Sequence, residues 1–225
     1  MILCLETSAS ICSVAIGRGS QLIAIQESIS PNDHASMIIT HVQNCLKEAD
    51  LTLKDIEAIA VSQGPGSFTG LRVGVSAAKG LCYAMDIPMI AISTLSALAW
   101  RAFQEYPDAQ HAIAMIEARK NEVFGAVYGR DLEMELSDQV ITLYPNWHQS
   151  VVEEWQSIIF CGPGCRKYHE ISHPTPLKFD LKPPSAMNLV ELAFEKHIKK
   201  DYCVAKSFSP NYIKSPHITQ PRKVL

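Results

Sequence analysis

The chain has 225 residues, of which 47% are hydrophobic and 8% aromatic, and its formal net charge at pH 7 is −3. This length allows one large domain or two lobes of roughly 100 residues each, and the composition is typical of a globular α/β core. The weak net charge gives no whole-chain indication of binding to nucleic acid or to an anionic membrane. No apolar run approaches the roughly 20 residues of a membrane span, and the N-terminus lacks a basic signal region, so we expect a cytoplasmic protein. The seven cysteines lie mostly in apolar runs and are expected to be reduced and buried.

The first half of the chain alternates short apolar runs with longer amphipathic segments, which predicts strands and helices. Pro31-Asn32-Asp33 provides an N-cap sequence for the first predicted helix. The predicted strands are 2–6, 12–17, 22–28, 58–62 and 88–92, and the predicted helices are 34–49, 71–84 and 94–106. This order of elements is typical of a three-layer α/β domain.

The second half of the chain contains a pattern that repeats the first. A predicted strand at 157–161 runs into Gly162-Pro163-Gly164, which is 98 residues after the Gly-Pro-Gly of the first half. An internal duplication and a chance recurrence of a common turn both explain this. The other predicted elements are strands at 112–117, 122–128 and 139–143 and a helix at 188–198. We expect an N-terminal lobe at 1–110, a C-terminal lobe at 111–205 and a basic, extended tail at 206–225.

The most informative stretch is VSQGPGSFTGLRVG, residues 61–74, which joins a predicted buried strand to a predicted helix. Gly64, Gly66 and Gly70 allow unusual backbone angles and close backbone approach, and a helix N-terminus favours anions. The loop lacks the Gly-Lys-Ser/Thr ending of a Walker A motif and the glycine spacing of a dinucleotide fingerprint. A phosphate-compatible corner and a plain structural turn both remain open.

Small residues in the next helix need an explanation, because each interior glycine costs about 1 kcal/mol relative to alanine. Gly70, Gly74 and Ala78 fall on one face of this helix, and the helix at 34–49 is apolar on two faces. Tight internal packing and a subunit interface are the two interpretations. We expect the two helices to form a partner interface, whose predicted residues are His34, Ile38, Val42, Gly70, Gly74, Ala78 and Leu81.

A literal H-E-x-x-H motif occurs at residues 169–173, as in zinc peptidases. Pro174 disfavours helical geometry at His173, and the flanking sequence offers no apolar stripe to bury a catalytic helix. We therefore expect no zinc site and no peptidase activity.

The assembled pattern resembles a known family. ETSASICSVAI at the start, SQGPGSFTGLRVG, EARKNEVFGAVY and a late SPNYIK are similar to the TsaB family, also called YeaZ, over nearly the whole chain. The resemblance implies an α/β fold of the actin-like, Hsp70-like (ASKHA, ribonuclease H-like) type, with two similar lobes. It also implies a subunit that pairs with TsaD in making N6-threonylcarbamoyladenosine at position 37 of tRNAs and that does not itself transfer the group.

The family motifs mark particular residues of this sequence. The resemblance implies a degenerate phosphate-loop region, and the residues predicted to face an anion or nucleotide are Glu6, Thr7, Ser8, Gly64, Gly66, Ser67 and Arg72. A second family stretch and a late Pro-x-Tyr correspond to Glu117, Arg119, Glu122, Phe124 and Tyr212. Glu117 stands where Asp is common and Phe124 where Tyr is common, so a role for a phenolic hydroxyl is in doubt.

The resemblance also bears on chemistry. The catalytic partner carries a His-x-x-x-His metal pair on its first long helix, whereas here His34 and His41 are seven residues apart, about 10 Å along a helix. We expect no catalytic residue, metal or cofactor in this chain, with metal bound by the TsaD-like partner and ATP used by a complex that includes a TsaE-like ATPase. A homodimer of the chain alone is also considered. The alternatives are a stand-alone nucleotide-binding, kinase-like enzyme and, resting on the H-E-x-x-H motif alone, a metallopeptidase.

Overall fold

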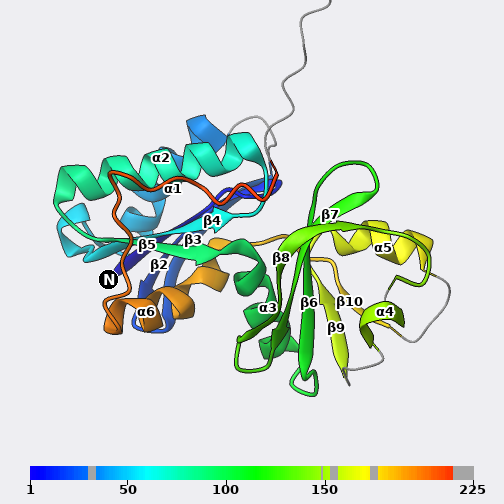
Figure 1. Cartoon of the computed structure of the whole chain (residues 1–225). Coiled ribbons are helices and arrows are strands. Elements are labelled where there is room, and N and C mark those ends of the chain that lie inside the picture. The colour runs from blue at the N-terminus through cyan, green and yellow to red at the C-terminus, as the bar shows by residue number, and fades with distance from the viewer. Residues whose placement is uncertain (30–33, 148, 153–156, 173–176, 215–225) are drawn as a thin grey trace, which may run out of the picture.

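The computed structural model describes the chain except for residues 30–33, 148, 153–156, 173–176 and 215–225. Strands gather into two five-stranded sheets, one in each lobe (Figure 1). The first sheet contains β1 (Ile2–Glu6), β2 (Ile11–Arg18), β3 (Gln21–Ile29), β4 (Ala58–Gly64) and β5 (Met89–Ser93). The second contains β6 (His111–Glu117), β7 (Glu122–Gly129), β8 (Met134–Thr142), β9 (Ile158–Cys161) and β10 (Lys178–Asp180).

The two sheets have the same topology. Their strand orders are β3-β2-β1-β4-β5 and β8-β7-β6-β9-β10, with the first three strands of each lobe antiparallel and the last two added in parallel. Gly64 ends β4 and Gly162 directly follows the equivalent strand β9, and the two have similar positive φ values, 107° and 99°. The repeat suspected from the two Gly-Pro-Gly turns is therefore a structural one.

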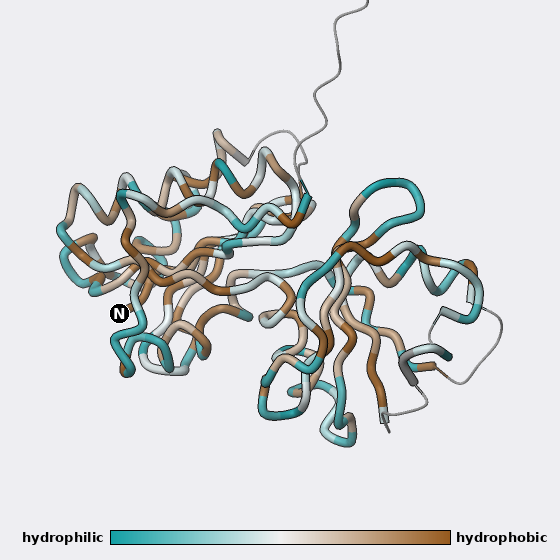
Figure 2. Tube along the Cα trace, in the orientation of Figure 1, coloured by the Kyte–Doolittle hydropathy of each residue, from teal (hydrophilic) through white to brown (hydrophobic). Residues whose placement is uncertain are grey.

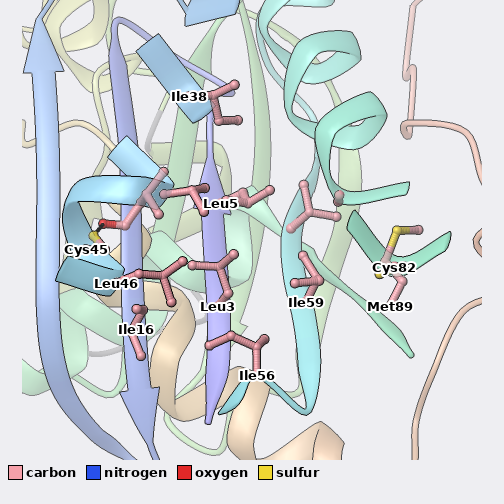
Figure 3. Close-up of a cluster of buried hydrophobic side chains, with 14 of the residues drawn as sticks. Leu3, Leu5, Ile16, Ile38, Cys45, Leu46, Ile56, Ile59, Cys82 and Met89 are labelled. Carbon is pink, nitrogen blue, oxygen red and sulfur yellow. Dashed lines mark hydrogen bonds between the residues drawn. The ribbon is translucent and has the colours of Figure 1, made fainter. Parts of the chain in front are cut away.

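One face of the first sheet is covered by α1 (His34–Glu48) and α2 (Phe68–Met85) (Figure 1). Figure 3 shows Ile38 and Leu46 of α1 in one cluster with Leu3 and Leu5 of the central strand. Cys45 Sγ, also from α1, donates to Val14 O of β2 at 3.2 Å. In Figure 2 the strands are largely hydrophobic, whereas the turn between β6 and β7 is hydrophilic. The N-cap sequence predicted for α1 lies outside the described residues. Residues Leu53–Asp55 form a short 3-10 turn, η1, before β4.

The third helix of each lobe packs against the sheet of the other lobe. Helix α3 (Thr94–Glu105) contributes Leu98 and Ala102 to a core with β6, β7 and β9. The 3-10 turn η2 (Ala186–Leu189) and α6 (Val190–Ile198) pack on the free face of the first sheet. The expected division at residues 1–110 and 111–205 therefore differs from the structure, because residues 186–198 complete the first lobe.

The outer face of the second sheet carries a short helix, α5 (Cys165–Ile171), and a further short helix, α4 (Gln149–Val152), precedes β9. Tyr168 of α5 is fully buried and stacks on Phe160, with ring centroids 5.5 Å apart. Helix α5, β10 and α4 were not predicted. Among the described residues, the structure contains no helix long and apolar enough to cross a membrane.

A buried ion pair joins α3 to the end of the second sheet. Arg101 Nη2 lies 2.8 Å from Asp180 Oδ2, and the same guanidinium donates to the carbonyl oxygens of Lys182 and Pro183. Both charged side chains are almost completely buried. Removing either partner would leave the other charge unpaired in the interior, so this pair ties α3 to the second sheet.

The expected tail does not begin at residue 206. Residues 203–214 pack on the folded body, starting with Cys203 N donating to Met89 O of the first lobe at 2.9 Å. This segment is extended, as predicted, but it is part of the folded body as far as Lys214. Residues 215–225 of the predicted tail lie outside the described chain.

Candidate functional site

The glycine loop lies at the C-terminal end of β4 and leads directly into α2. The Ser67 hydroxyl accepts a hydrogen bond from Gly70 N at 3.2 Å and so caps the helix. The strand, the loop and the helix are confirmed. The helix begins at Phe68, three residues before the predicted start, because the cap lies inside the glycine-rich sequence.

The loop packs against the turn that follows β1, so the chain itself fills much of the predicted anion corner. Ser67 N donates to Ser8 O at 2.7 Å, and Thr7 Oγ1 donates to Gly70 O at 2.8 Å. A Cβ atom at Gly66 would lie 2.3 Å from Ser8 O, and one at Gly70 would lie 2.0 Å from Thr7 O. Glycine is required at both positions because the two turns are in backbone contact.

The same explanation extends along α2 and corrects the predicted interface residues. A Cβ atom at Gly74 would lie 2.3 Å from Thr7 Oγ1, and Ala78 is fully buried. Gly70, Gly74 and Ala78 therefore serve internal packing, and in this conformation a partner has no access to them.

The predicted interface residues of α1 follow the same pattern. Ile38 and Val42 are buried in the core beneath α1, and Leu81 of α2 is half-buried against that core. The side chain of His34 lies outside the described part of the structure. A partner interface on these helices stays a prediction, but its contacts must come from residues on their outward faces.

One glycine of α2 has no internal explanation. Gly80 is exposed, and a Cβ atom built on it would meet nothing within 4 Å in the described structure. An exposed glycine inside a helix lowers helix stability by about 1 kcal/mol without any gain in packing within this chain. Its neighbours on the outward face include the exposed Ser76 and Tyr83, and Ile39 of α1 is exposed as well.

Glu6 ends β1 and is fully buried. Its Oε1 accepts a hydrogen bond from Ser8 N at 2.6 Å, and Oε2 has no hydrogen-bond partner among the described residues. Burial raises the pKa of the Glu6 carboxyl, and the hydrogen bonds with Ser8 oppose this only in part. The environment therefore disfavours the charged form that a metal ligand or a general base requires.

Two cavities flank the glycine loop where the lobes meet. The first has a volume of about 220 Å³ and is lined by residues that include Gly66, Phe68 and Arg119. The second, of about 240 Å³, is lined by residues that include Ser8 and Ser67. Of the residues predicted to face an anion, Ser8, Gly66 and Ser67 thus line a cavity, whereas Glu6, Thr7 and Gly64 are buried.

Arg72, the other residue of that prediction, takes part in an aromatic cluster. Its guanidinium carbon lies 4.0 Å from the centre of the Phe68 ring, and its Nε donates to Tyr212 Oη at 3.3 Å. The rings of Phe68 and Tyr212 are 4.7 Å apart. Arg72 is therefore held by stacking and by one hydrogen bond beside Phe68 and Tyr212, two residues that line the first cavity.

The family-motif residues meet at this first cavity from different parts of the chain. Glu117, Arg119 and Phe124 line it from the β6–β7 hairpin, and Tyr212 lines it from the C-terminal segment. Glu122 does not belong to the lining; its carboxylate accepts hydrogen bonds from Lys214 Nζ at 2.9 and 2.8 Å. The hydrogen bond from Lys214 lowers the pKa of Glu122.

Sequence reasoning missed the residue that holds the β6–β7 turn in place. Lys167 Nζ, from α5, donates to the carbonyl oxygens of Ala118, Arg119 and Glu122 at 3.3, 2.8 and 3.2 Å. It fixes the backbone from which Arg119 projects. No pattern in the sequence marks this lysine, because its partners are main-chain atoms about 45 residues away.

The H-E-x-x-H stretch is partly helical, which corrects the expectation that its flanks could not bury a helix. Cys165 and Tyr168 anchor α5 in the core. The His169 ring packs edge-on against the Phe179 ring, with the ring centroids 4.9 Å apart. The helix ends at Ile171 and Ser172 is already extended; His173 and Pro174 lie outside the described residues. Within the described chain, no three His, Cys, Asp or Glu side chains gather to hold a metal ion.

Comparisons with known proteins agree with this architecture. The family model for TsaD, the tRNA N6-adenosine threonylcarbamoyltransferase, matches residues 24–208. The tRNA threonylcarbamoyladenosine biosynthesis protein TsaB of Haemophilus influenzae is 30% identical over 222 residues, which cover 95% of this chain and 93% of that protein.

Solved structures show the same fold. YeaZ from Pseudomonas aeruginosa superimposes with a TM-score of 0.81 at 31% identity, covering 94% of this chain and 98% of that one. The activator of the 2-hydroxyisocaproyl-CoA dehydratase from Clostridium difficile, solved with bound ADPNP, has a TM-score of 0.52 at 10% identity, covering 89% of this chain and 96% of that one. The second likeness concerns the fold alone, and together they show the actin-like (ASKHA) fold of two similar lobes.

Proposed function

The chain belongs to the TsaB family, and from this premise we propose that it is a non-catalytic subunit of the complex that makes N6-threonylcarbamoyladenosine at position 37 of tRNAs. Its partner in this proposal is a TsaD-like catalytic subunit, which binds the metal. A TsaE-like ATPase accounts for the use of ATP, and the site of action is the cytoplasm. In the absence of the partner, the surface that binds the TsaD-like subunit forms the interface of a homodimer.

The observation that carries the proposal is the contrast between the glycines of α2. Gly70 and Gly74 are explained by contacts within the chain, and Gly80 is not. A glycine that faces open space in a long helix suits close approach of a second helix, because it lets two backbones come together. We therefore place the partner interface on the outward faces of α1 and α2, around Gly80, Ser76 and Ile39.

The contacts of the glycine loop favour a structural role for this subunit over a role in the transfer chemistry. Transfer of a carbamoyl group needs a metal or a set of donors that stabilises developing negative charge. Here the loop has no lysine, its Ser67 amide is bonded to Ser8 O, and Glu6 is in an environment that favours its neutral form. Binding energy from an interface of standard size, about 1,600 Å², is enough to favour one arrangement of a partner's lobes.

Gly80→Leu tests the interface directly. The variant should fold at least as stably as the parent, because leucine has the higher helix propensity by about 1 kcal/mol. It should nevertheless lose binding to the TsaD-like partner in a pull-down with purified proteins. Glu195→Leu, which adds the same side chain at an exposed position of α6, is the matched control and should bind normally.

Normal binding by Gly80→Leu at full stability would contradict this location. Gly74→Leu is not a usable test of the interface, because its side chain would collide with Thr7 and disturb the fold.

A further inference from the structure

The C-terminal residues 203–214, which we call the strap, run from the end of α6 along the first lobe to the junction of the two lobes (Figure 1). Lys79 Nζ, on α2, donates to the carbonyl oxygens of Lys206 and Phe208 at 3.3 and 3.0 Å. With the bond between Cys203 N and Met89 O, these contacts fix the first part of the strap to the first lobe. The strap therefore reaches the junction from a defined direction.

Asn211 contacts both lobes at once. Its backbone N donates to Gln63 O at the end of β4 at 2.7 Å, and its side-chain Nδ2 donates to Asp138 Oδ2 on β8 at 2.7 Å. A Cβ atom at Gly64 would lie 2.8 Å from Asn211 O. The first Gly-Pro-Gly turn thus leaves room for the strap as well as for the β1 turn.

The next residues repeat this alternation between lobes. Tyr212 packs on Phe68 and accepts a hydrogen bond from Arg72, both in the first lobe. Lys214 then forms an ion pair with Glu122 of the second lobe, with Nζ 2.8 Å from Oε2. Neither group of this pair is fully exposed, and hydrogen bonds between charged groups are the stronger kind.

We infer that the strap is a latch that holds the two lobes at one relative orientation. Within four residues it binds the first lobe twice and the second lobe twice, on either side of the cavity of about 220 Å³ that Asn211, Tyr212 and Lys214 help to line. Separating the lobes at this cavity requires breaking the bonds of Asn211 to Asp138 and of Lys214 to Glu122. The inference concerns the isolated chain and does not rest on the proposed function.

Amide hydrogen exchange on the purified chain tests the latch. Asn211→Asp places a carboxylate against Asp138 and leaves the backbone bond to Gln63 possible. Glu122→Gln weakens the second link from the other lobe and gives an independent break should the first variant unfold. The matched control is Asp201→Asn, which weakens an ion pair with Lys196 at 37% and 59% side-chain exposure that does not cross between lobes.

A latch predicts that both Asn211→Asp and Glu122→Gln raise exchange about tenfold in the strap and also in residues 66–68 and 117–119, from which the two lobes line the cavity. The radius of gyration measured by small-angle X-ray scattering should rise as well. Combining Asn211→Asp with Asp138→Asn exchanges donor and acceptor, restores the hydrogen bond and should return exchange to the parent level. Faster exchange confined to residues 203–214, with an unchanged radius of gyration, would show that the strap only rests on the surface and would overturn the inference.

Discussion

The two lobes share one sheet topology and differ in the helices inserted between equivalent strands. In the first lobe α1 and α2 have 15 and 18 residues, whereas in the second lobe α5 has 7 and the described part of α4 has 4. Helix α5 has one buried face, and it covers its sheet through Cys165 and Tyr168 on that face.

The longer helices of the first lobe provide an inner and an outer face. Their inner faces cover the sheet through residues such as Val42 and Ala78, and their outer faces leave Ile39 at 45% and Tyr83 at 92% exposure. A helix needed only to cover a five-stranded sheet could be shorter, as the second lobe shows. The extra length provides the outward surface on which we propose the partner interface.

Equivalent glycines allow the two lobes to be compared by mutation, and this comparison has the largest expected effect on stability. A Cβ atom at Gly66 would lie 2.3 Å from Ser8 O, and one at Gly164 would lie 2.8 Å from the carbonyl carbons of Met115 and Ile116. Neither position has a positive φ, so the cost of alanine is steric. We expect Gly66→Ala and Gly164→Ala each to lower the free energy of unfolding by about 1–3 kcal/mol, with Gly66→Ala the more severe.

Chemical denaturation measures this difference, and Gly80→Ala is the control. That substitution meets no neighbouring atoms and should raise stability by about 0.5–1 kcal/mol. Negligible changes in the free energy of unfolding at both residues 66 and 164 would contradict the prediction. They would mean that close backbone contact does not fix the Gly-Pro-Gly turns in either lobe.

The glutamates that end the first strand of each lobe provide a smaller, pH-dependent comparison. Burial raises the pKa of Glu6, so the folded chain retains a proton that the unfolded chain releases above the ordinary carboxyl range. Stability from this group is therefore lost as the pH rises toward the folded-state pKa. Glu117 is exposed at the equivalent strand end and serves as the control.

Glu6→Gln should remove this dependence, because the amide keeps an acceptor for Ser8 N and carries no charge. Its melting temperature should exceed that of the parent at about pH 8 and approach it at about pH 5, whereas Glu117→Gln should follow the parent at both. A parent and a Glu6→Gln variant with parallel pH profiles would show that Glu6 is ionised in the fold.

Much of the fold could be predicted because its strands are short apolar runs between glycine-rich turns. The central strand was predicted with its observed bounds, Ile2–Glu6, and the repeated Gly-Pro-Gly indicated the duplication. Strand β10 was missed because it has three residues, two of them charged, and α5 because only Cys165 and Tyr168 face inward. Elements this short carry no periodic signal.

The site was harder to predict, because residue type does not reveal which side of a helix faces the core. The pattern of small residues on α2 could not distinguish Gly74, which contacts Thr7, from Gly80, which contacts nothing nearby. Likewise, the exchange of α3 and α6 between lobes depends on contacts between residues far apart in sequence. Residues 206–214 were expected to belong to a basic, extended tail, and their contacts were not predicted because those of Asn211 and Lys214 are single polar bonds rather than an apolar pattern.

We propose that this chain provides a binding surface and no reacting group. Reconstituted threonylcarbamoylation of tRNA, with a TsaD-like partner and a TsaE-like ATPase, tests it in one measurement on Arg119→Ala. Arg119 lines the cavity at the lobe junction, and the other cation of the lining, Lys214, is bonded to Glu122. We predict that Arg119→Ala, in an intact complex, retains modification within about tenfold, or ~1.4 kcal/mol, whereas Gly80→Leu loses binding and modification together. A loss of about a thousandfold in Arg119→Ala with the complex intact would contradict the claim and place this subunit in the chemistry.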